Sequence, residues 1–168
     1  MVLKSYAKIN LSLSVNKKLK SGLHDLQSYF SLINLHDIIH IKKTKNGKSD
    51  KISFKGPHSK FVNKKNNSIQ NILILMRENK LINNYYSVKV FKKIPVFAGF
   101  GGGTSNAATI FKFLLKKKQK KKLSKDIFIK LGSDFSLFFY NRGFLNSLRK
   151  IIKIDNKIKL NLLLVYPK

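Results

Sequence analysis

The sequence predicts an α+β fold in which helices pack on a mixed β-sheet. Apolar and polar residues alternate in segments 9–15 and 86–90, as they do in half-buried strands. Apolar residues recur with helical spacing in segments 69–81 and 105–115. A stretch that holds four of the nine glycines, residues 99–103, lies between the second strand segment and the second helical segment. Together these observations predict one domain built from both kinds of element.

The first half of the chain is predicted to contain strands, a loop and one helix. Four alternating apolar residues predict a half-buried strand: Ile9, Leu11, Leu13 and Val15. Segment 37–41 is extended, and segment 43–67 carries Asn-Gly and Gly-Pro turn signals, which predict a hairpin and loop around a short strand at 51–54. Asn67 or Ser68 caps a helix. Its apolar stripe is expected in the core: Ile69, Ile72, Leu73, Leu75 and Met76.

In the second half, the predicted elements flank the glycine-rich stretch. A strand carries Tyr86, Val88 and Val90 and is closed by Pro95. The following helix has one apolar face, which consists of Ala107, Ala108, Phe111 and Leu115, and it ends at the lysine-rich run 116–122. A short helix runs from a cap at Ser124 to Gly132. Segments 135–140 and 158–166 are predicted strands.

Length and composition are those of one soluble domain. The 168 residues include no cysteine, which excludes a disulfide framework, a thiolate metal site and a cysteine nucleophile. No apolar stretch approaches the roughly 20 residues of a membrane span, and the N-terminal segment lacks the pattern of a signal peptide. We therefore expect a cytoplasmic protein with no membrane partner, whose chemistry uses oxygen and nitrogen groups.

The net charge of +28 has two interpretations. It arises from 35 basic against 7 acidic residues, and such an excess is typical of nucleic-acid-binding proteins. However, only three basic residues are arginine, the side chain best suited to bidentate recognition of phosphates and bases. The chain is also rich in Lys, Ile, Asn and Phe, which AT-rich codons encode. We favour a compositional bias that places lysines on tolerant surface positions, and nucleic acid is not the partner we expect.

The strand, glycine-rich loop and helix predict a phosphate-binding site. Glycines let backbone N–H groups converge on an anion, and the helix N-terminus adds unpaired donors and partial positive charge. Thr104 and Ser105 add hydroxyls for a phosphate oxygen or Mg²⁺. The stretch fits neither a Walker A loop nor a dinucleotide fingerprint, because Thr104 stands where the first needs lysine and the second needs glycine. A glycine turn without function is the alternative, at an entropic cost that a plain turn does not require.

The segment IPVFAGFGGGTSNAA resembles the phosphate-binding motif of the GHMP kinases. Three further segments resemble that family in the same order: SYAKINLSLSV, SGLHDLQSYFSLINLHDIIHI and LGSDFSLFF. The doubled glycines are most similar to the branch of the non-mevalonate isoprenoid pathway that takes a cytidine diphosphate substrate. The resemblance implies the family's N-terminal ATP-binding domain over residues 1–150, with 151–168 as the start of a truncated second domain.

That resemblance implies ATP- and Mg²⁺-dependent phosphorylation of 4-(cytidine 5′-diphospho)-2-C-methyl-D-erythritol at its 2-hydroxyl. Asp134 matches the family's catalytic aspartate and would accept the hydroxyl proton, while Lys8 would keep Asp134 ionised. Asn10 and His24 would contact the substrate, and Ser105 or Thr104 would help to bind Mg²⁺. The ATP phosphate loop would comprise Pro95, Val96, Phe97, Ala98, Gly99, Phe100, Gly101, Gly102, Gly103, Thr104 and Ser105.

Departures from the family pattern leave three accounts open. Leu23 replaces a tyrosine, Ser21 an aspartate and Ser136 a proline, and most of the second domain has no counterpart. The chain is a reduced enzyme that closes its cleft as a homodimer, an inactive remnant, or a basic RNA-binding module with a stacking face of exposed aromatic rings. We favour the kinase, because the positions that carry the chemistry are retained.

Overall fold

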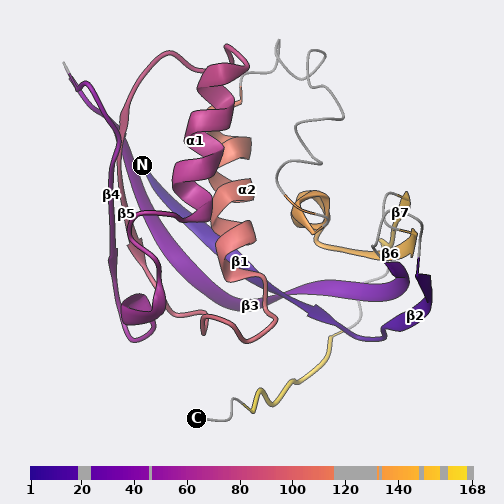
Figure 1. Ribbon diagram of the computed structural model, residues 1–168. Helices are drawn as coiled ribbons and strands as arrows, with labels where there is room; N and C mark the ends of the chain where they lie inside the picture. Colours follow the sequence, from indigo (N-terminus) through magenta and orange to yellow (C-terminus); the bar gives the residue numbers. More distant parts are fainter. Residues whose placement is uncertain are drawn as a thin grey trace.

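The computed structural model describes residues 1–18, 24–45, 47–115, 132, 134–147, 150–155 and 159–165. These residues form a seven-stranded mixed sheet with two helices on one face (Figure 1), which confirms the predicted α+β class. The strands are β1 (Val2–Asn10), β2 (Ser14–Lys18), β3 (His24–Lys43), β4 (Lys51–Lys55), β5 (Tyr86–Phe91), β6 (Arg142–Ser147) and β7 (Lys150–Lys153). The helices are α1 (Ser68–Glu78) and α2 (Gly102–Leu114), and η1 (Ser59–Phe61) and η3 (Phe135–Phe139) are short 3₁₀ helices.

The long strand β3 organises the sheet. It pairs antiparallel with β1 and β2, and also with β5 and β6. The predicted hairpin in segment 43–67 is wrong, because β4 does not pair with β3. Instead β4 lies parallel to β5. A parallel pair needs a long crossover between its strands, and η1 and α1 supply it.

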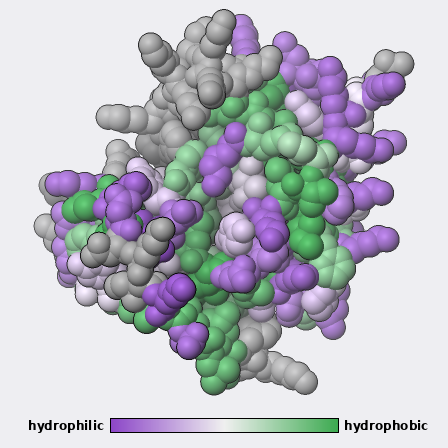
Figure 2. Space-filling view, turned by 180° about the vertical axis from the view of Figure 1, so that it is seen from behind, coloured by the Kyte–Doolittle hydropathy of each residue, from purple (hydrophilic) through white to green (hydrophobic). Residues whose placement is uncertain are grey.

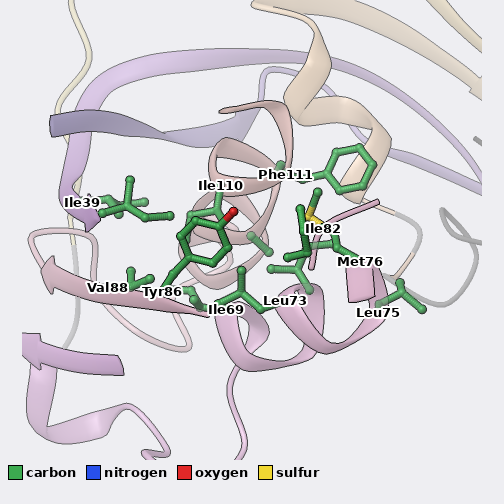
Figure 3. Packing of buried hydrophobic residues seen from close by; sticks show 14 of the residues in the cluster. Ile39, Ile69, Leu73, Leu75, Met76, Ile82, Tyr86, Val88, Ile110 and Phe111 are labelled. Atoms are coloured by element: carbon green, nitrogen blue, oxygen red, sulfur yellow. The ribbon is translucent and has the colours of Figure 1, made fainter. Parts of the chain in front are cut away.

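The core lies between the two helices and the sheet (Figure 3). Ile39 and Val88 from the sheet meet Leu73 from α1 and Phe111 from α2, and all four side chains are fully buried. The predicted stripe of α1 is confirmed, and so is the cap, since Asn67 Oδ1 accepts a hydrogen bond from the backbone N–H of Gln70 at 3.0 Å. Helix α2 begins at Gly102, three residues earlier than predicted, so the last glycines belong to its first turn.

Two predicted strands are absent from the described residues. Residues Phe135–Phe139 form η3, because the buried side chains Phe135, Leu137 and Phe138 do not alternate as the side chains of a strand do. Segment 159–165 forms no strand, and its apolar side chains are exposed. The predicted single strand 9–15 is confirmed only at its ends, since β1 ends at Asn10 and β2 begins at Ser14, and its expected half-burial is wrong because Leu11, Leu13 and Val15 are exposed.

The far end of the sheet holds a hairpin that the sequence did not predict. Strands β6 and β7 pair antiparallel, so the sheet continues past the predicted domain boundary at residue 150. The lysine-rich run 116–122 and most of the predicted helix 124–132 lie outside the described residues.

None of the helices in the described part of the chain has the length and apolar character that crossing a bilayer requires. Figure 2 shows hydrophilic side chains projecting around the margin of the rear face, with hydrophobic surface between them. Exposed aromatic residues occur on several different elements, among them Tyr6 on β1, Tyr29 on β3, Phe91 on β5 and Phe113 on α2.

Candidate active site

A buried lysine and a half-exposed aspartate form the chemical centre of the site. Lys8 Nζ lies 3.2 Å from Asp134 Oδ2 and donates a second hydrogen bond to Asn10 Oδ1 at 3.1 Å. The Lys8 side chain is 5% exposed and that of Asp134 is 46% exposed. The pair therefore presents a carboxylate to solvent while its cation is held below the surface.

Lys8 points inward beside an irregularity in the pairing of β1 with β3. The register shifts between Tyr6 and Lys8, where β3 has more residues than β1, and the consecutive residues Ala7 and Lys8 are both buried. Such a bulge re-aims side chains in a strand. Beside it, Lys8 reaches Asp134, which immediately precedes η3.

The glycine-rich loop, residues 95–101, is tied directly to this pair. The backbone N–H of Lys8 donates to the carbonyl oxygen of Phe100 at 3.0 Å. The same residue thus holds the loop through its main chain and Asp134 through its side chain. As a result, the proposed phosphate loop and the half-exposed carboxylate lie next to each other.

A buried aspartate anchors the entrance to the loop. Asp37 on β3 accepts backbone hydrogen bonds from Lys93 at 2.8 Å and Ile94 at 2.9 Å, and it forms an ion pair with Lys92. The Asp37 and Lys92 side chains are both buried. The chain that enters the loop at Pro95 is therefore fixed to the sheet.

The exit from the loop is fixed by Ser105, and this argues against Ser105 as a metal ligand. Its hydroxyl donates to the carbonyl of Tyr6 at 2.6 Å and accepts from the hydroxyl of Ser5 at 2.8 Å. Ser105 is buried, and it does not line the pocket beside the loop, whereas every residue from Pro95 to Thr104 does. We therefore assign Ser105 to joining α2 to β1, which leaves Thr104 as the loop hydroxyl that reaches the pocket.

Gly101 is the position where the loop requires glycine. Its φ is +65°, and a Cβ added there would lie 2.7 Å from the Phe138 ring. The close approach packs η3 against the loop. Asp134 immediately precedes η3. The close packing of η3 on Gly101 therefore helps to set the distance between the loop and the carboxylate.

The pocket beside the loop suits a polyanion. Its volume is about 400 Å³, within the range of about 300–1,000 Å³ that is usual for small-molecule sites. The N-termini of both helices border it: Ser68 of α1 lies 3.0 Å from the position of a Cβ on Gly103 of α2, and no side chain caps α2. Two helix N-termini bring unpaired N–H donors and partial positive charge to one place, so the residues present fit a triphosphate.

The pocket also contains an unsatisfied acceptor. Asn106 lines it, its side chain is buried, and its Oδ1 has no hydrogen-bond partner within the described part of the protein. A buried acceptor without a donor is costly unless a ligand or water supplies one. Within the same described ranges, no three His, Asp or Glu side chains gather into a metal site.

The structure does not bring His24 to this centre. His24 is exposed at the start of β3, where it pairs with Lys18 of β2. Asn10 pairs with Phe30, six residues further along β3, which corresponds to about 20 Å of extended strand. Lys8, Asn10, Asp134 and the loop therefore form one cluster, and His24 lies at a distance along the same strand.

Three functional positions were missed by the sequence reasoning: Asp37, Lys92 and Asn106. Asp37 carried a usable signal, because it is one of only 7 acidic residues and lies inside an apolar strand segment. Lys92 carried none, since it is one lysine among many. Asn106 follows the hydroxyl pair of the loop, yet nothing in the sequence distinguishes a ligand-facing asparagine from a capping one.

The fold resembles that of one class of protein, the GHMP kinases, and the chain is a homologue of kinases in that superfamily. No family model matches the chain. The crystal structure of a 4-(cytidine 5′-diphospho)-2C-methyl-D-erythritol kinase superposes with a TM-score of 0.68 at 23% identity, covering 92% of this chain and 55% of that one. That likeness shows the fold.

Sequence similarity narrows the class to one group of enzymes. The chain is 44% identical over 170 aligned residues to the 4-diphosphocytidyl-2-C-methyl-D-erythritol kinase of Pelagibacter ubique, covering 98% of this chain and 59% of the relative. It is 34% identical to the enzyme of the same name from Ureaplasma parvum, covering 96% of this chain and 62% of the relative. The chain is a homologue of these kinases, and it spans about three fifths of their length.

Proposed function

We propose that this chain transfers the γ-phosphate of ATP to the 2-hydroxyl of 4-(cytidine 5′-diphospho)-2-C-methyl-D-erythritol. The observation that carries the proposal is the pairing of buried Lys8 with half-exposed Asp134 beside the glycine-rich loop. The similarity to kinases of that substrate supports the choice of acceptor.

Phosphoryl transfer asks the protein mainly for alignment and charge stabilisation. In the proposed reaction Asp134 accepts the proton of the substrate's 2-hydroxyl while the hydroxyl oxygen bonds to the γ-phosphorus of ATP. The bond from that phosphorus to the bridging oxygen breaks, and ADP leaves with the electron pair. Lys8, which donates hydrogen bonds to Asp134 and Asn10, stabilises negative charge on the attacking oxygen.

The loop and the helix N-termini hold the triphosphate in this proposal. Gly102, Gly103 and Thr104 form the first turn of α2, whose backbone N–H groups lack helical partners. Mg²⁺, when bound, supplies charge neutralisation, and it typically keeps several waters and takes phosphate oxygens as ligands. Thr104 is the side chain on the loop suited to join them, since its hydroxyl borders the pocket.

Asn10 and His24 are the proposed substrate contacts. His24 lies on β3 far from Phe30, the residue of β3 that pairs with Asn10. This separation suits a long substrate with the polyol at one end and the cytosine at the other. In this arrangement Asn10 lies near the reacting hydroxyl, because Lys8 donates to its Oδ1. His24 then lies toward the nucleoside.

The test is ATP-dependent phosphorylation of the cytidine diphosphate substrate by the full chain, followed by ³¹P NMR of the product. We expect Asp134→Asn to lower kcat by about 10³-fold, within the usual range for losing a general base. Asp155→Asn is the matched control, because Asp155 is an exposed aspartate paired only with Lys153 among the contacts described, and it should leave kcat unchanged.

Absence of phosphoryl transfer by the unaltered protein would overturn the proposed function. Equal turnover by the unaltered protein and Asp134→Asn would instead remove Asp134 from its role as base.

A further inference from the structure

Phe97 on the loop combines an exposed aromatic side chain with an unfavourable backbone conformation. Its side chain is 91% exposed, and its φ is +65°. Neither property favours phenylalanine. Exposure forfeits the burial of an aromatic ring, and a positive φ crowds the Cβ of every residue except glycine.

Local structure accounts for the other such residue but not for Phe97. Among the described residues, the non-glycine positions with positive φ are Lys80 and Phe97. Lys80 terminates α1, and its N–H returns to the carbonyl of Arg77, as is usual where a helix ends in the left-handed conformation. Phe97 ends no helix. Strain of this kind at the edge of a pocket points to function.

Phe97 lies on the rim of the pocket proposed for the nucleotide. The ring borders the same volume as Gly102, Gly103 and Thr104. A second exposed aromatic residue, Phe61 of η1, borders the pocket from a different segment. Two exposed phenyl rings at one pocket provide apolar, flat surface that phosphate groups do not use.

Asn106 adds a second, independent feature of the pocket. Its buried Oδ1 needs a hydrogen-bond donor, which a water or a ligand can supply, whereas the oxygens of an ionised phosphate only accept. The pocket therefore suits a ligand that brings an N–H or O–H group together with a face that an aromatic ring can cover. A nucleoside attached to the phosphates has both.

We propose that Phe97 is a nucleotide-binding residue whose ring stacks on the base of the ATP held by the loop. The inference rests on the proposed function, because it takes the phosphates to lie at the N-terminus of α2. On this proposal the unfavourable backbone conformation serves to present the ring at the rim of the pocket. Stacking on an aromatic ring is typically worth about 1–3 kcal/mol per base, which corresponds to a Kd change of about 5- to 150-fold.

Two ligands separate stacking on the base from support of the loop. Binding of Mg-ATP and of Mg-tripolyphosphate is measured by calorimetry at one ionic strength, for the full chain and for Phe97→Ala and Phe97→Gly. Phe91→Ala is the control, because Phe91 is a phenylalanine on β5 that is 42% exposed and does not border the pocket. We expect both Phe97 variants to bind ATP about tenfold more weakly and to bind tripolyphosphate as the unaltered protein does.

Thermal unfolding without ligand separates the two roles, because stacking predicts that the melting temperature of Phe97→Gly does not fall with its affinity for ATP. Glycine adopts a positive φ freely, so Phe97→Gly is expected to melt at the same temperature as the unaltered protein or higher, while its affinity for ATP falls. A purely structural role for Phe97 predicts that both quantities fall together.

Each remaining outcome overturns the inference. Unchanged ATP binding in both Phe97 variants removes the stacking role, and equal weakening for ATP and tripolyphosphate shows that Phe97 acts through the loop. If the unaltered protein binds tripolyphosphate but shows no preference for ATP, the base is not recognised. If it binds neither ligand, the proposed function fails together with the inference.

Discussion

The two ends of the sheet are built differently. Where α1 and α2 cover β3 and β5, the apolar side chains are enclosed, and Leu73 is fully buried. At the other end, Leu11, Leu13 and Val15 are exposed, and segment 159–165 borders a cavity of about 1,000 Å³, with Leu163 90% exposed. The covered end carries the proposed phosphate loop. The enclosed core and the proposed nucleotide pocket therefore lie at one end of the sheet, while the other end exposes apolar surface.

The largest expected effect on stability comes from the buried ion pair at the covered end. Asp37→Asn would leave the Lys92 ammonium buried without its carboxylate, and breaking such a pair costs about 3–5 kcal/mol. Urea unfolding monitored by circular dichroism measures the loss. Asp155→Asn removes the exposed pair with Lys153 and is expected to cost less than about 1 kcal/mol. Equal losses in the two variants would contradict the contrast between the ends.

A second test compares two leucines. Leu73→Ala opens a cavity in the core and should cost about 2–5 kcal/mol, whereas Leu163→Ala should change the free energy of unfolding by less than about 0.5 kcal/mol. Light scattering on Leu163→Asp sharpens the comparison. If the homodimer predicted from the sequence forms through this surface, the charge shifts it to monomer. A large stability loss in Leu163→Ala would show that the segment is packed.

The third test is confined to the loop. Gly101→Ala adds both a strained φ and a Cβ 2.7 Å from the Phe138 ring, while Gly99→Ala adds only the strain, because no atom lies within 4 Å of its Cβ position. We expect about 1–2 kcal/mol for Gly99→Ala and a larger loss for Gly101→Ala. Turnover should fall further in Gly101→Ala, since η3 carries Asp134. Equal losses in Gly99→Ala and Gly101→Ala would mean that η3 shifts to accommodate the added methyl group.

The sequence predicted the covered end well, because periodicity reports burial against one surface. The stripe of α1, the alternation of β5 and the cap at Asn67 all follow from local rules that the fold obeys. The loop was predictable for the same reason, since glycine has few other uses ahead of a helix. Lys8 and Asp134 were predicted from the resemblance to the GHMP kinases, and they approach each other beside a register shift between β1 and β3 that no local signal marks.

At the other end of the sheet, the same rules of periodicity and turn signals gave wrong predictions. Leu11, Leu13 and Val15 alternate as in a half-buried strand, yet nothing in the described residues covers them. The apolar run of η3 resembles a strand because both of its sides pack, on α2 and on β3. The parallel pairing of β4 with β5 is a long-range choice, and the turn signals of segment 43–67 carry no information about it.

The smallest expected effect concerns Lys112, which links α2 to η3. Although much of the side chain is exposed, its Nζ donates to the carbonyl of Phe138 at 2.8 Å, and partial burial lowers the pKa of Lys112 from its usual 10.5. Between the lowered value and 10.5 the unfolded chain binds more protons than the folded one, so this contribution to stability rises with pH. The penalty for holding the charge is therefore complete below that window and is relieved as the pH rises through it.

Lys112→Met removes the titrating group, so the stability of the unaltered protein relative to this variant should increase as the pH rises from the lowered pKa of Lys112 to 10.5. Urea unfolding at several pH values measures the difference, and Lys89→Met, at an exposed lysine of β5, corrects for the general loss of one positive charge. A difference that stays constant with pH, or that shrinks, would mean that the Nζ of Lys112 is hydrated in solution. The bond from Lys112 to Phe138 would then not help to hold η3, and the position of Asp134 would depend on its pairing with Lys8 and on the packing of η3 against Gly101 and Phe111.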